Sequence, residues 1–255
     1  MKKFLAILMV FAMLFAFAGC GADKADSEAI KENGKIVVGI TDYAPMDYKE
    51  KGSDEWTGFD AEFARLFAKE LGVEAEFIEI DWDNKFMELE SGSIDCIWNG
   101  MTITDEAKAN ASVSNAYVKN AQVLVMKADK VASITKPEDA KDLKFAVEKG
   151  SAGADCAKEA GYKNIVEVDT QATALMEVKS GTADATIIDI TMANAMTGEG
   201  TSYADLAKGI EYSSEEYGVA FRKESDLTEM FNTFMASIKE TDLKKLAEKY
   251  ELTLA

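Results

Sequence analysis

One stretch of the sequence combines residue types that could hold a small anion, and it runs over residues 95–108. The apolar run 94–98 at its start is short enough to be a buried strand. Asn99-Gly100 follows, where the backbone can approach a bound molecule closely. Thr102, Thr104 and the acids after them are typical of a helix start, whose free N–H groups and positive dipole end attract a carboxylate. The stretch is therefore a candidate binding site, although many α/β loops share this pattern.

A second candidate is Asp189, which lies in the apolar run 187–190. A charged side chain between apolar residues needs a reason, because an unpaired buried carboxylate is energetically expensive. A cationic group on a ligand would supply that reason. A purely structural role for the carboxylate is the alternative.

The sequence has no histidine and its acids are scattered, so no spacing indicates a metal site, and we expect no cofactor. Two cysteines, Cys96 and Cys156, lie beyond the N-terminal segment. Two cysteines in a secreted protein invite a disulfide interpretation. However, Cys96 lies in an apolar strand and Cys156 at a helix start in a different part of the chain. We therefore expect two free thiols.

The N-terminal segment is similar to a bacterial secretory leader. Lys2-Lys3 and the apolar run 4–17 form the charged and apolar regions of a signal peptide, and the run is too short for a comfortable membrane span. An N-terminal anchor that is never removed is the alternative. The end of the segment, 17–20, resembles the lipobox of bacterial lipoproteins, so residues 1–19 would be removed and Cys20 acylated. Residues 20–33 would then be a flexible tether to the membrane.

Length and charge limit the class of protein. A chain of 255 residues with 47% hydrophobic residues can hold two ordinary domains with real cores. The net charge is −18, and removal of the two lysines in residues 1–19 makes it −20. So acidic a surface disfavours nucleic acid and electrostatic docking on anionic lipid, which leaves the acyl group as the membrane link. A role in solubility is the simplest explanation of the charge.

An internal echo indicates two similar lobes. Segments 89–97 and 178–186 each read as a helix end, Ser-Gly, two residues, Asp and a strand. The glycines, Gly92 and Gly181, suit the left-handed position after a helix. Each copy follows an amphipathic helix and precedes a candidate binding loop. Two α/β lobes with a cleft between them are therefore expected.

Strands and helices alternate in both halves. In the first half we expect strands at 35–40, 73–77 and 94–98 and helices at 60–71 (N-capped by Asp60, ended by Gly72) and 84–90. In the second half we expect strands at 123–126, 145–147, 165–168, 185–188 and 217–222 and helices at 137–140, 155–160, 172–179, 226–239 and 242–250. The alternation predicts largely parallel sheets with covered faces. Ligands then bind beyond the carboxyl ends of strands, at the loops after Ile40, Trp98, Val147 and Ile188.

Six segments carry a family resemblance: 58–60 (GFD), 99–104 (NGMTIT), 117–125 (YVKNAQVLV), 150–153 (GSAG), 188–189 (ID) and 217–220 (YGVA). In this order and spacing the chain resembles the extracytoplasmic solute-binding proteins, family 3, that deliver polar amino acids to ABC importers. The resemblance implies an α/β periplasmic-binding-protein type II fold. Lobe 1 would comprise 34–124 and 218–255, and lobe 2 would comprise 125–217. Two crossing strands, near Val123 and Val219, would form a hinge.

The resemblance also implies roles for individual residues. Tyr43 and Phe59 match aromatic positions against the ligand, with simple packing as the alternative. In the loop that begins at Asn99, Gly100 and Thr102 match the groups that hold the ligand carboxylate, although Thr102 alone would read as a helix cap. Further donors come from the second-lobe loop at Ser151 and Ala152. Asp189 matches the partner of the α-ammonium group.

One departure from the family concerns the arginine that usually forms a fork with the ligand carboxylate. Its place is taken by Ala107, with Lys108 beside it. The helix end and the hydroxyls could hold the carboxylate alone, or Lys108 could replace arginine as a point charge. Otherwise the ligand is an amino acid derivative whose carboxylate is modified or missing.

The expected function is that of a membrane-anchored, monomeric binding protein that faces the extracytoplasmic side. It would capture an amino acid or related amine in the cleft and hand it to an ABC permease, with no catalytic step. One alternative is a cleft enzyme of the same fold, similar to cyclohexadienyl dehydratase, which would need a poised acid or base. The other is an extracellular amino-acid sensor domain, for which a further membrane or signalling segment would be expected.

Overall fold

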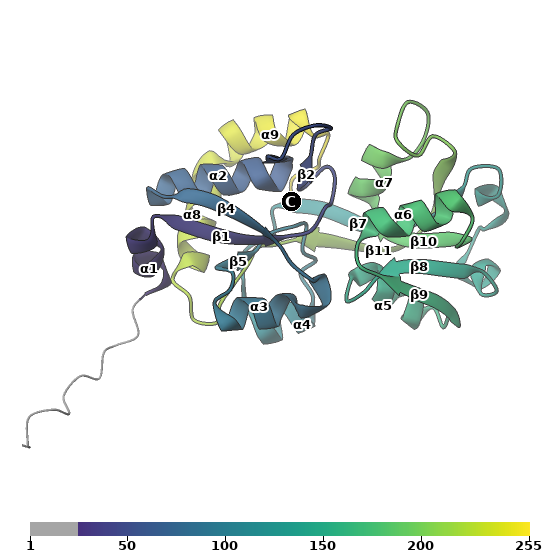
Figure 1. Ribbon diagram of the computed structural model, residues 1–255, viewed down its shortest axis with the longest axis horizontal. Helices are drawn as coiled ribbons and strands as arrows, with labels where there is room; N and C mark the ends of the chain where they lie inside the picture. Colours follow the sequence, from purple (N-terminus) through teal and green to yellow (C-terminus); the bar gives the residue numbers. More distant parts are fainter. Residues whose placement is uncertain (1–24) are drawn as a thin grey trace, which may run out of the picture.

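The computed structural model describes residues 25–255, and the predicted leader and Cys20 lie outside these described residues. Two lobes, each built on a five-stranded sheet, lie side by side in Figure 1. The sheet of lobe 1 has the order β4-β1-β5-β12-β6, and that of lobe 2 the order β11-β7-β10-β8-β9. The two-lobe α/β architecture predicted from the internal echo is therefore confirmed.

The strands of lobe 1 are β1 (Lys35–Ile40), β4 (Glu74–Glu79), β5 (Cys96–Ile97), β6 (Ser112–Val113) and β12 (Ala220–Phe221). Those of lobe 2 are β7 (Val118–Lys127), β8 (Lys144–Glu148), β9 (Asn164–Val168), β10 (Ala185–Asp189) and β11 (Leu206–Tyr217). Both sheets are mixed: β12 runs antiparallel to β5 and β6, and β7 runs antiparallel to β10 and β11. The prediction of largely parallel sheets was wrong for these strands. They lie where the chain leaves and re-enters a lobe, and such a strand can join a sheet in the reverse direction.

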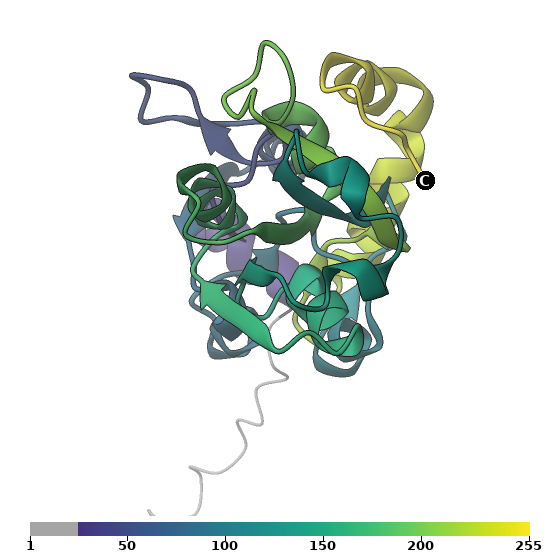
Figure 2. The same cartoon turned by 90° about the vertical axis from the view of Figure 1, so that its right-hand side faces the viewer.

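The helices of lobe 1 are α1 (Asp26–Asn33), α2 (Phe59–Leu71), α3 (Lys85–Ser91), α4 (Asp105–Asn110), α8 (Leu227–Ile238) and α9 (Lys244–Lys249). Those of lobe 2 are α5 (Ala152–Glu159), α6 (Gln171–Ser180) and α7 (Ile190–Met196). Short elements complete the described chain: the hairpin β2 (Tyr48–Lys49) and β3 (Trp56–Thr57), 3-10 turns at Trp82–Asn84, Val131–Ser133 and Pro137–Ala140, and a π-helical segment, Lys239–Leu243. In lobe 2, α5 and α6 pack against β8 and β10 from opposite sides (Figures 1 and 2). Within residues 25–255 no helix has the length and apolar composition that a membrane crossing requires.

Helix α2 shows how the sequence sets the core of lobe 1. Phe63 and Phe67 repeat at helical spacing, are fully buried and contact the Trp98 ring with centroids 5.0 and 6.4 Å away. Gly72 ends the helix in the left-handed conformation, as predicted. Asp60 does not cap it, because Gly58 occupies that position and Asp60 lies inside the first turn, buried. Its carboxylate instead accepts hydrogen bonds from the Gly100 N–H and the Tyr117 hydroxyl.

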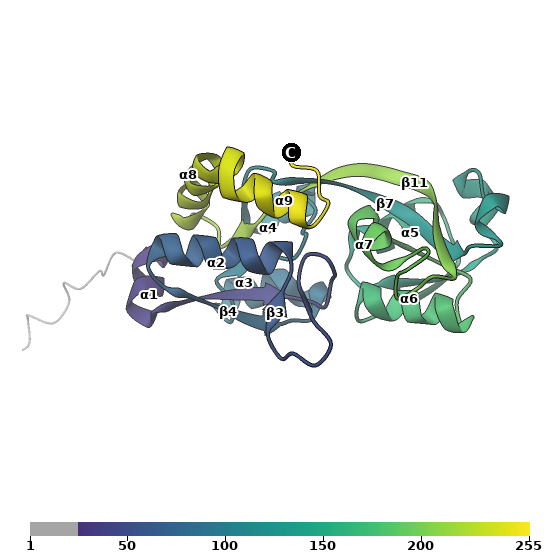
Figure 3. The ribbon, with the colours of Figure 1, turned by 90° about the horizontal axis from the view of Figure 1, so that it is seen from above.

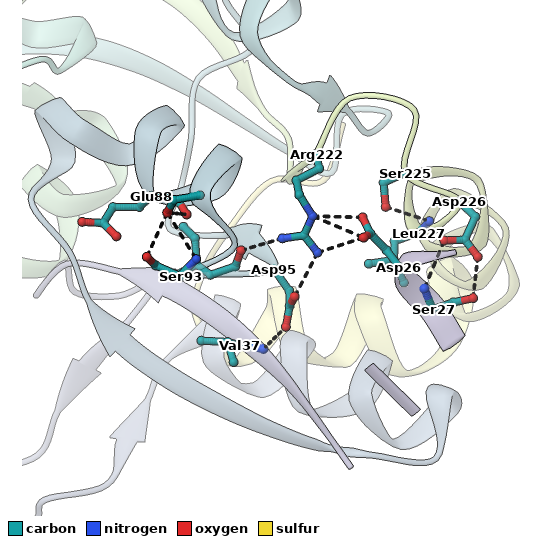
Figure 4. A network of polar contacts seen from close by, with 12 residues as sticks. Asp26, Ser27, Val37, Glu88, Ser93, Asp95, Arg222, Ser225, Asp226 and Leu227 are labelled. Carbon is teal, nitrogen blue, oxygen red and sulfur yellow. Dashed lines mark hydrogen bonds and ion pairs between the residues drawn. The ribbon is translucent and has the colours of Figure 1, made fainter. Parts of the chain in front are cut away.

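The predicted tether is helical from Asp26 onward, and the prediction of a flexible segment there was wrong. Figure 4 shows Arg222 between two carboxylates, Asp26 of α1 and Asp95 before β5, with both ion pairs at 3.0 Å. The backbone N–H of Ser27 donates to Asp226 at 3.1 Å, and the hydroxyl of Ser27 donates to the same carboxylate. Ile30 is buried against lobe 1. Polar composition suggested a tether, but an apolar anchor and an arginine 196 residues away in the chain fix the segment.

The chain crosses between the lobes twice, along β7 and β11, which lie side by side between the lobes in Figure 3. The first residues of β7, Val118 and Lys119, pair with the C-terminal segment of lobe 1, whereas 122–126 pair with β10 of lobe 2. The chain returns after Tyr217, and β12 joins lobe 1. The boundary drawn at Leu124 from the sequence falls inside β7, so the strand itself connects the lobes.

Candidate ligand-binding site between the lobes

A pocket lies between the lobes, at the carboxyl ends of β5, β8 and β10. Lobe 1 contributes Tyr43, Trp82, Lys85, Phe86, Asn99, Gly100, Met101, Thr102, Thr104, Glu106 and Ala107. Lobe 2 contributes Glu148, Gly150, Ser151, Ala152, Asp155, Gln171 and Asp189. Seven of the eight predicted site residues line this pocket, and the structure brings them together from both lobes. The eighth is Phe59.

Phe59 does not reach the pocket. Its ring is fully buried in lobe 1, where it stacks on Tyr117 with ring centroids 6.1 Å apart and meets Phe63 edge to face. The first turn of α2 directs this side chain into the core. The packing alternative is therefore the correct account of Phe59, and the expectation that it contacts a ligand was wrong. Tyr43 does line the pocket, where its hydroxyl lies 2.6 Å from Thr191 of lobe 2.

The loop after β5 is held by buried polar side chains. Gly100 has φ of +54°, and a Cβ there would lie 2.6 Å from the Tyr43 ring, so only glycine fits. Its N–H donates to Asp60 at 2.6 Å, and Asn99 donates to Asp47 at 2.8 Å. Burial raises the pKa of Asp60 to about 7. The GFD segment therefore shapes the binding loop from behind, and the Gly100 N–H is not available to a ligand.

Helix α4 follows, and it differs from the anion site that the sequence suggested. Thr104 caps it, since its hydroxyl accepts from the N–H of Ala107 at 3.0 Å. Thr102 instead donates its hydroxyl proton to Glu215 at 2.9 Å. The helix has six residues, and its first turn carries two acids, one of which, Glu106, lines the pocket. Acids there already occupy the positive end of the helix dipole.

Ala107 faces the pocket and is buried, at the position where the family usually has arginine. Lys108, considered as its substitute, is exposed and does not line the pocket. The cation that does line it is Lys85, which the sequence analysis overlooked. A lysine in the first turn of a helix interacts unfavourably with the helix dipole. This unusual position was the sequence feature that could have identified Lys85 as a site residue. Burial lowers the pKa of Lys85, and its ammonium group donates to Trp82 O at 3.1 Å and Gly150 O at 3.0 Å.

Asp189 lies at the end of β10, 5% exposed, and in the described chain the side chains that donate hydrogen bonds to its carboxylate are neutral. Its Oδ1 accepts from Asn120, from Gln122 at 2.9 Å and from the Tyr217 hydroxyl at 2.6 Å. Its Oδ2 accepts from Gln171 at 2.5 Å. Burial, then the nearby Glu215, raises the pKa of Asp189 to about 7 against these donors. Within residues 25–255, no lysine or arginine forms an ion pair with it.

A second buried carboxylate, Glu148, also lines the pocket, and the sequence analysis missed it. Burial and the neighbouring Asp189 raise the pKa of Glu148 to about 8. The signal was an acid directly after the apolar run 145–147, a position equivalent to that of Asp189 after its own strand. The following loop turns into α5, which Ser151 caps by accepting from the Ala154 N–H at 3.2 Å. Ala152 begins that helix beside the pocket.

The lobes contact each other beside the pocket. Lys149 pairs with Asp83 at 2.7 Å, and Lys85 reaches Gly150 as described. A Cβ on Gly150 would lie 2.8 Å from the Asp83 backbone, so the second-lobe loop packs closely against lobe 1. Cys96 and Cys156, one in each lobe, are free thiols, as predicted. The arrangement can enclose a small molecule and present buried carboxylates to its positive groups.

The model of the bacterial extracellular solute-binding proteins, family 3, matches residues 36–253. The arginine-binding extracellular protein ArtP of Bacillus subtilis is 32% identical over 98% of each chain. The ABC transporter glutamine-binding protein GlnH of the same organism is also 32% identical, over 94% of this chain and 93% of that protein. The structure of a mutant of ArgBP from T. maritima superposes with a TM-score of 0.82 at 32% identity, covering 89% of this chain and 99% of that one.

These relatives are binding proteins, not enzymes, and the structural likeness extends over both lobes. The family match covers all of the pocket-lining segments and both crossings between the lobes. The chain therefore belongs to the family 3 bacterial extracellular solute-binding proteins.

Proposed function

We propose that this protein binds an amino acid or a related amine between its lobes and delivers it to the permease of an ABC importer. The observation that carries the proposal is Asp189. It is a buried carboxylate in a pocket formed by both lobes, and every partner it has in the described chain is neutral. An ammonium group of a ligand would supply the missing charge. Relatives named for arginine and glutamine binding agree with such a ligand.

The other predicted residues have supporting roles in this proposal. Tyr43 provides an aromatic wall, and Asn99 and Gly100 form the backbone surface beneath the ligand. The hydroxyl of Thr102 retains lone pairs as an acceptor, although its proton goes to Glu215. On lobe 2, the N–H of Ala152 at the start of α5 supplies a donor. The hydroxyl of Ser151 donates its proton to Glu148 O and can offer a ligand only its lone pairs.

A binding screen tests this function directly. Thermal unfolding of the protein would be followed with the standard amino acids, agmatine and putrescine. At a hundred times its Kd, a ligand should add about 2.7 kcal/mol of stability. If no amino acid or amine changes the unfolding temperature or gives heat in calorimetry, the proposed function is wrong.

Binding should also close the lobes about the two crossing strands, because the pocket takes residues from both. X-ray scattering with a ligand at saturation should then give a smaller radius of gyration than without it. An unchanged radius, with binding confirmed by calorimetry, would contradict closure.

We further propose that Cys20 carries the lipid that holds the protein on the outer side of the membrane. The sequence around Cys20 supports this, and acyl chains provide the hydrophobic attachment. Cell fractionation tests it: wild type should stay with membranes, and Cys20→Ala should become soluble outside the cytoplasm. The anchor is excluded if both proteins fractionate as soluble.

A further inference from the structure

We propose that the ligand carries two positively charged groups, and that Glu148 binds the one that Asp189 does not. This inference rests on the proposed function, since it specifies the ligand class of the same pocket. The shared chemistry is that of a basic amino acid or of its decarboxylated amine. The argument depends on one unpaired oxygen, on the position of Glu148 beside Asp189, and on the charges of the pocket.

The unpaired oxygen is Oε1 of Glu148. The residue is only 3% exposed, it lines the pocket, and its Oε1 is buried without a hydrogen-bond partner in the described chain. An unpaired buried carboxylate oxygen is costly, and the great majority of such atoms in folded proteins have partners. A donor from a bound ligand would satisfy it.

The topology places Glu148 beside Asp189. Glu148 is the last residue of β8 and Asp189 the last residue of β10. These strands are parallel neighbours with Phe145 opposite Ala185, so Asp189 lies one residue beyond Glu148 at the same edge of the sheet, and both line the pocket. The two charges repel each other, and burial together with Asp189 favours the protonated form of Glu148 in the absence of a cation. A ligand with two cationic groups removes this repulsion at both positions.

The protein supplies little opposite charge, and the group that most favours the ionised form of Glu148 is the neutral side chain of Gln171. Among the lining residues there are four acids, Glu106, Glu148, Asp155 and Asp189, and one cation, Lys85. Lys85 directs its ammonium group to two backbone carbonyl oxygens and forms no ion pair with Glu148 in the described structure. The excess of negative charge therefore favours a cationic ligand over a neutral or acidic one.

The groups that would hold a ligand carboxylate are also depleted. Position 107 has no arginine, the Gly100 N–H donates to Asp60, and the Thr102 hydroxyl donates to Glu215. The pocket thus recognises positive groups by two buried carboxylates and offers a carboxylate few donors on lobe 1. This asymmetry is the basis for naming a ligand class.

Three related compounds test the proposal by calorimetry: L-arginine, the nearly isosteric L-citrulline, which lacks the side-chain charge, and agmatine, which lacks the carboxylate. Both arginine and agmatine should bind the wild-type protein at least thirty-fold more tightly than citrulline, because loss of one member of a buried charge pair has about that effect. The ratio of the arginine affinity to the agmatine affinity distinguishes a basic amino acid from a decarboxylated amine as the ligand. Arginine binds more tightly if the ligand is a basic amino acid, and agmatine does if it is an amine.

The variant Glu148→Gln keeps the shape of the side chain and removes its charge. It should lower the preference for arginine over citrulline at least tenfold, whereas Glu159→Gln, an exposed control on α5, should leave the preference unchanged. Equal binding of arginine and citrulline by wild type would overturn the proposal, as would an unchanged preference in Glu148→Gln. Either result, with neutral amino acids still bound, would leave the proposed function standing. Absence of binding by any amino acid or amine would overturn both.

Discussion

The two walls of the pocket differ in the chemistry they offer. The lobe 1 wall is aromatic and neutral, apart from Lys85 and the exposed Glu106. Its buried acids, Asp47 and Asp60, lie behind the wall and hold the loop at Asn99 and Gly100. The lobe 2 wall has three acids among seven residues, and two of them are buried. In the proposed site, buried carboxylates therefore hold the loop on one side and bind the ligand on the other. The difference is one of position. Each acid has one oxygen without a partner in the described chain, but Asp60 accepts from Gly100 and Tyr117 behind the wall, whereas Glu148 lines the pocket itself.

The largest test of this contrast is Asp189→Asn, which removes one charge from the lobe 2 wall and keeps its shape. Affinity for an ammonium-bearing ligand should fall by about thirty-fold or more, since one member of a buried charged pair is worth roughly 2–5 kcal/mol. Calorimetry compares it with Asp169→Asn, which removes an exposed charge from the same lobe. Equal affinity in Asp189→Asn and wild type would move the cation to another site.

A change of pH should have the next largest effect. The pKa of Asp189 is raised to about 7 and that of Glu148 to about 8, so without ligand both lose charge as the pH falls from 8 to 6. Glu215 opposes ionisation of Asp189, and Lys85 assists that of Glu148. Affinity for agmatine should therefore fall about tenfold or more over this range, at up to tenfold per pH unit for each group. Calorimetry at each pH measures it, and a constant affinity would contradict the assignment.

The raised pKa values of Asp189 and Glu148 also predict the direction in which stability changes with pH. Their folded-state pKa values lie above the unfolded ones, so the ligand-free protein binds more protons than the unfolded chain between about pH 4 and 8. Their contribution to stability is complete at the lower pH and is lost as the pH rises through 7 and 8. Denaturant unfolding of Glu148→Gln should show a smaller loss over this range than wild type.

The lobe 1 wall can be made to resemble that of its relatives by Ala107→Arg. A guanidinium at this position would form a fork with a ligand carboxylate, so citrulline should bind up to about tenfold more tightly, while agmatine should bind less tightly. Ala107→Lys is the matched control, since a lysine lacks the fork. A folded Ala107→Arg protein with both affinities unchanged would mean that this side chain does not reach the ligand.

The smallest expected effect compares the helix caps on the two walls. Thr104→Ala and Ser151→Ala should each cost about 1 kcal/mol of unfolding free energy, or roughly 2–4 °C in Tm without ligand. Ser151→Ala should cost more, because its hydroxyl also donates to Glu148 O at 2.8 Å. The control is Ser214→Ala, which changes an exposed residue of β11. If loss of either cap costs no more stability than this control, the role assigned to the two hydroxyls is contradicted.

Local patterns predicted most of the elements but not their partners. Apolar periodicity located α2 and β1, and the left-handed glycines Gly92 and Gly181 ended α3 and α6 as expected. Phe59 and Asp60 were misread because a residue in the first turn of a helix can point to the core or to a neighbouring loop. Their direction depends on Tyr117 and Gly100, which are distant in sequence.

By itself the sequence determined the two-lobe α/β fold, the binding loops at strand ends and the place of Asp189. Hydrophobic period, turn residues and a charge within an apolar run are local signals that can be read from the sequence alone. Only the tertiary structure decided which acids line the pocket. Glu148 and Asp189 line the same pocket because β8 and β10 are neighbours in the sheet. The ammonium group of Lys85 donates to one backbone carbonyl oxygen of each lobe. The charge of a pocket is set by side chains that the fold brings together and by the partners it gives each of them.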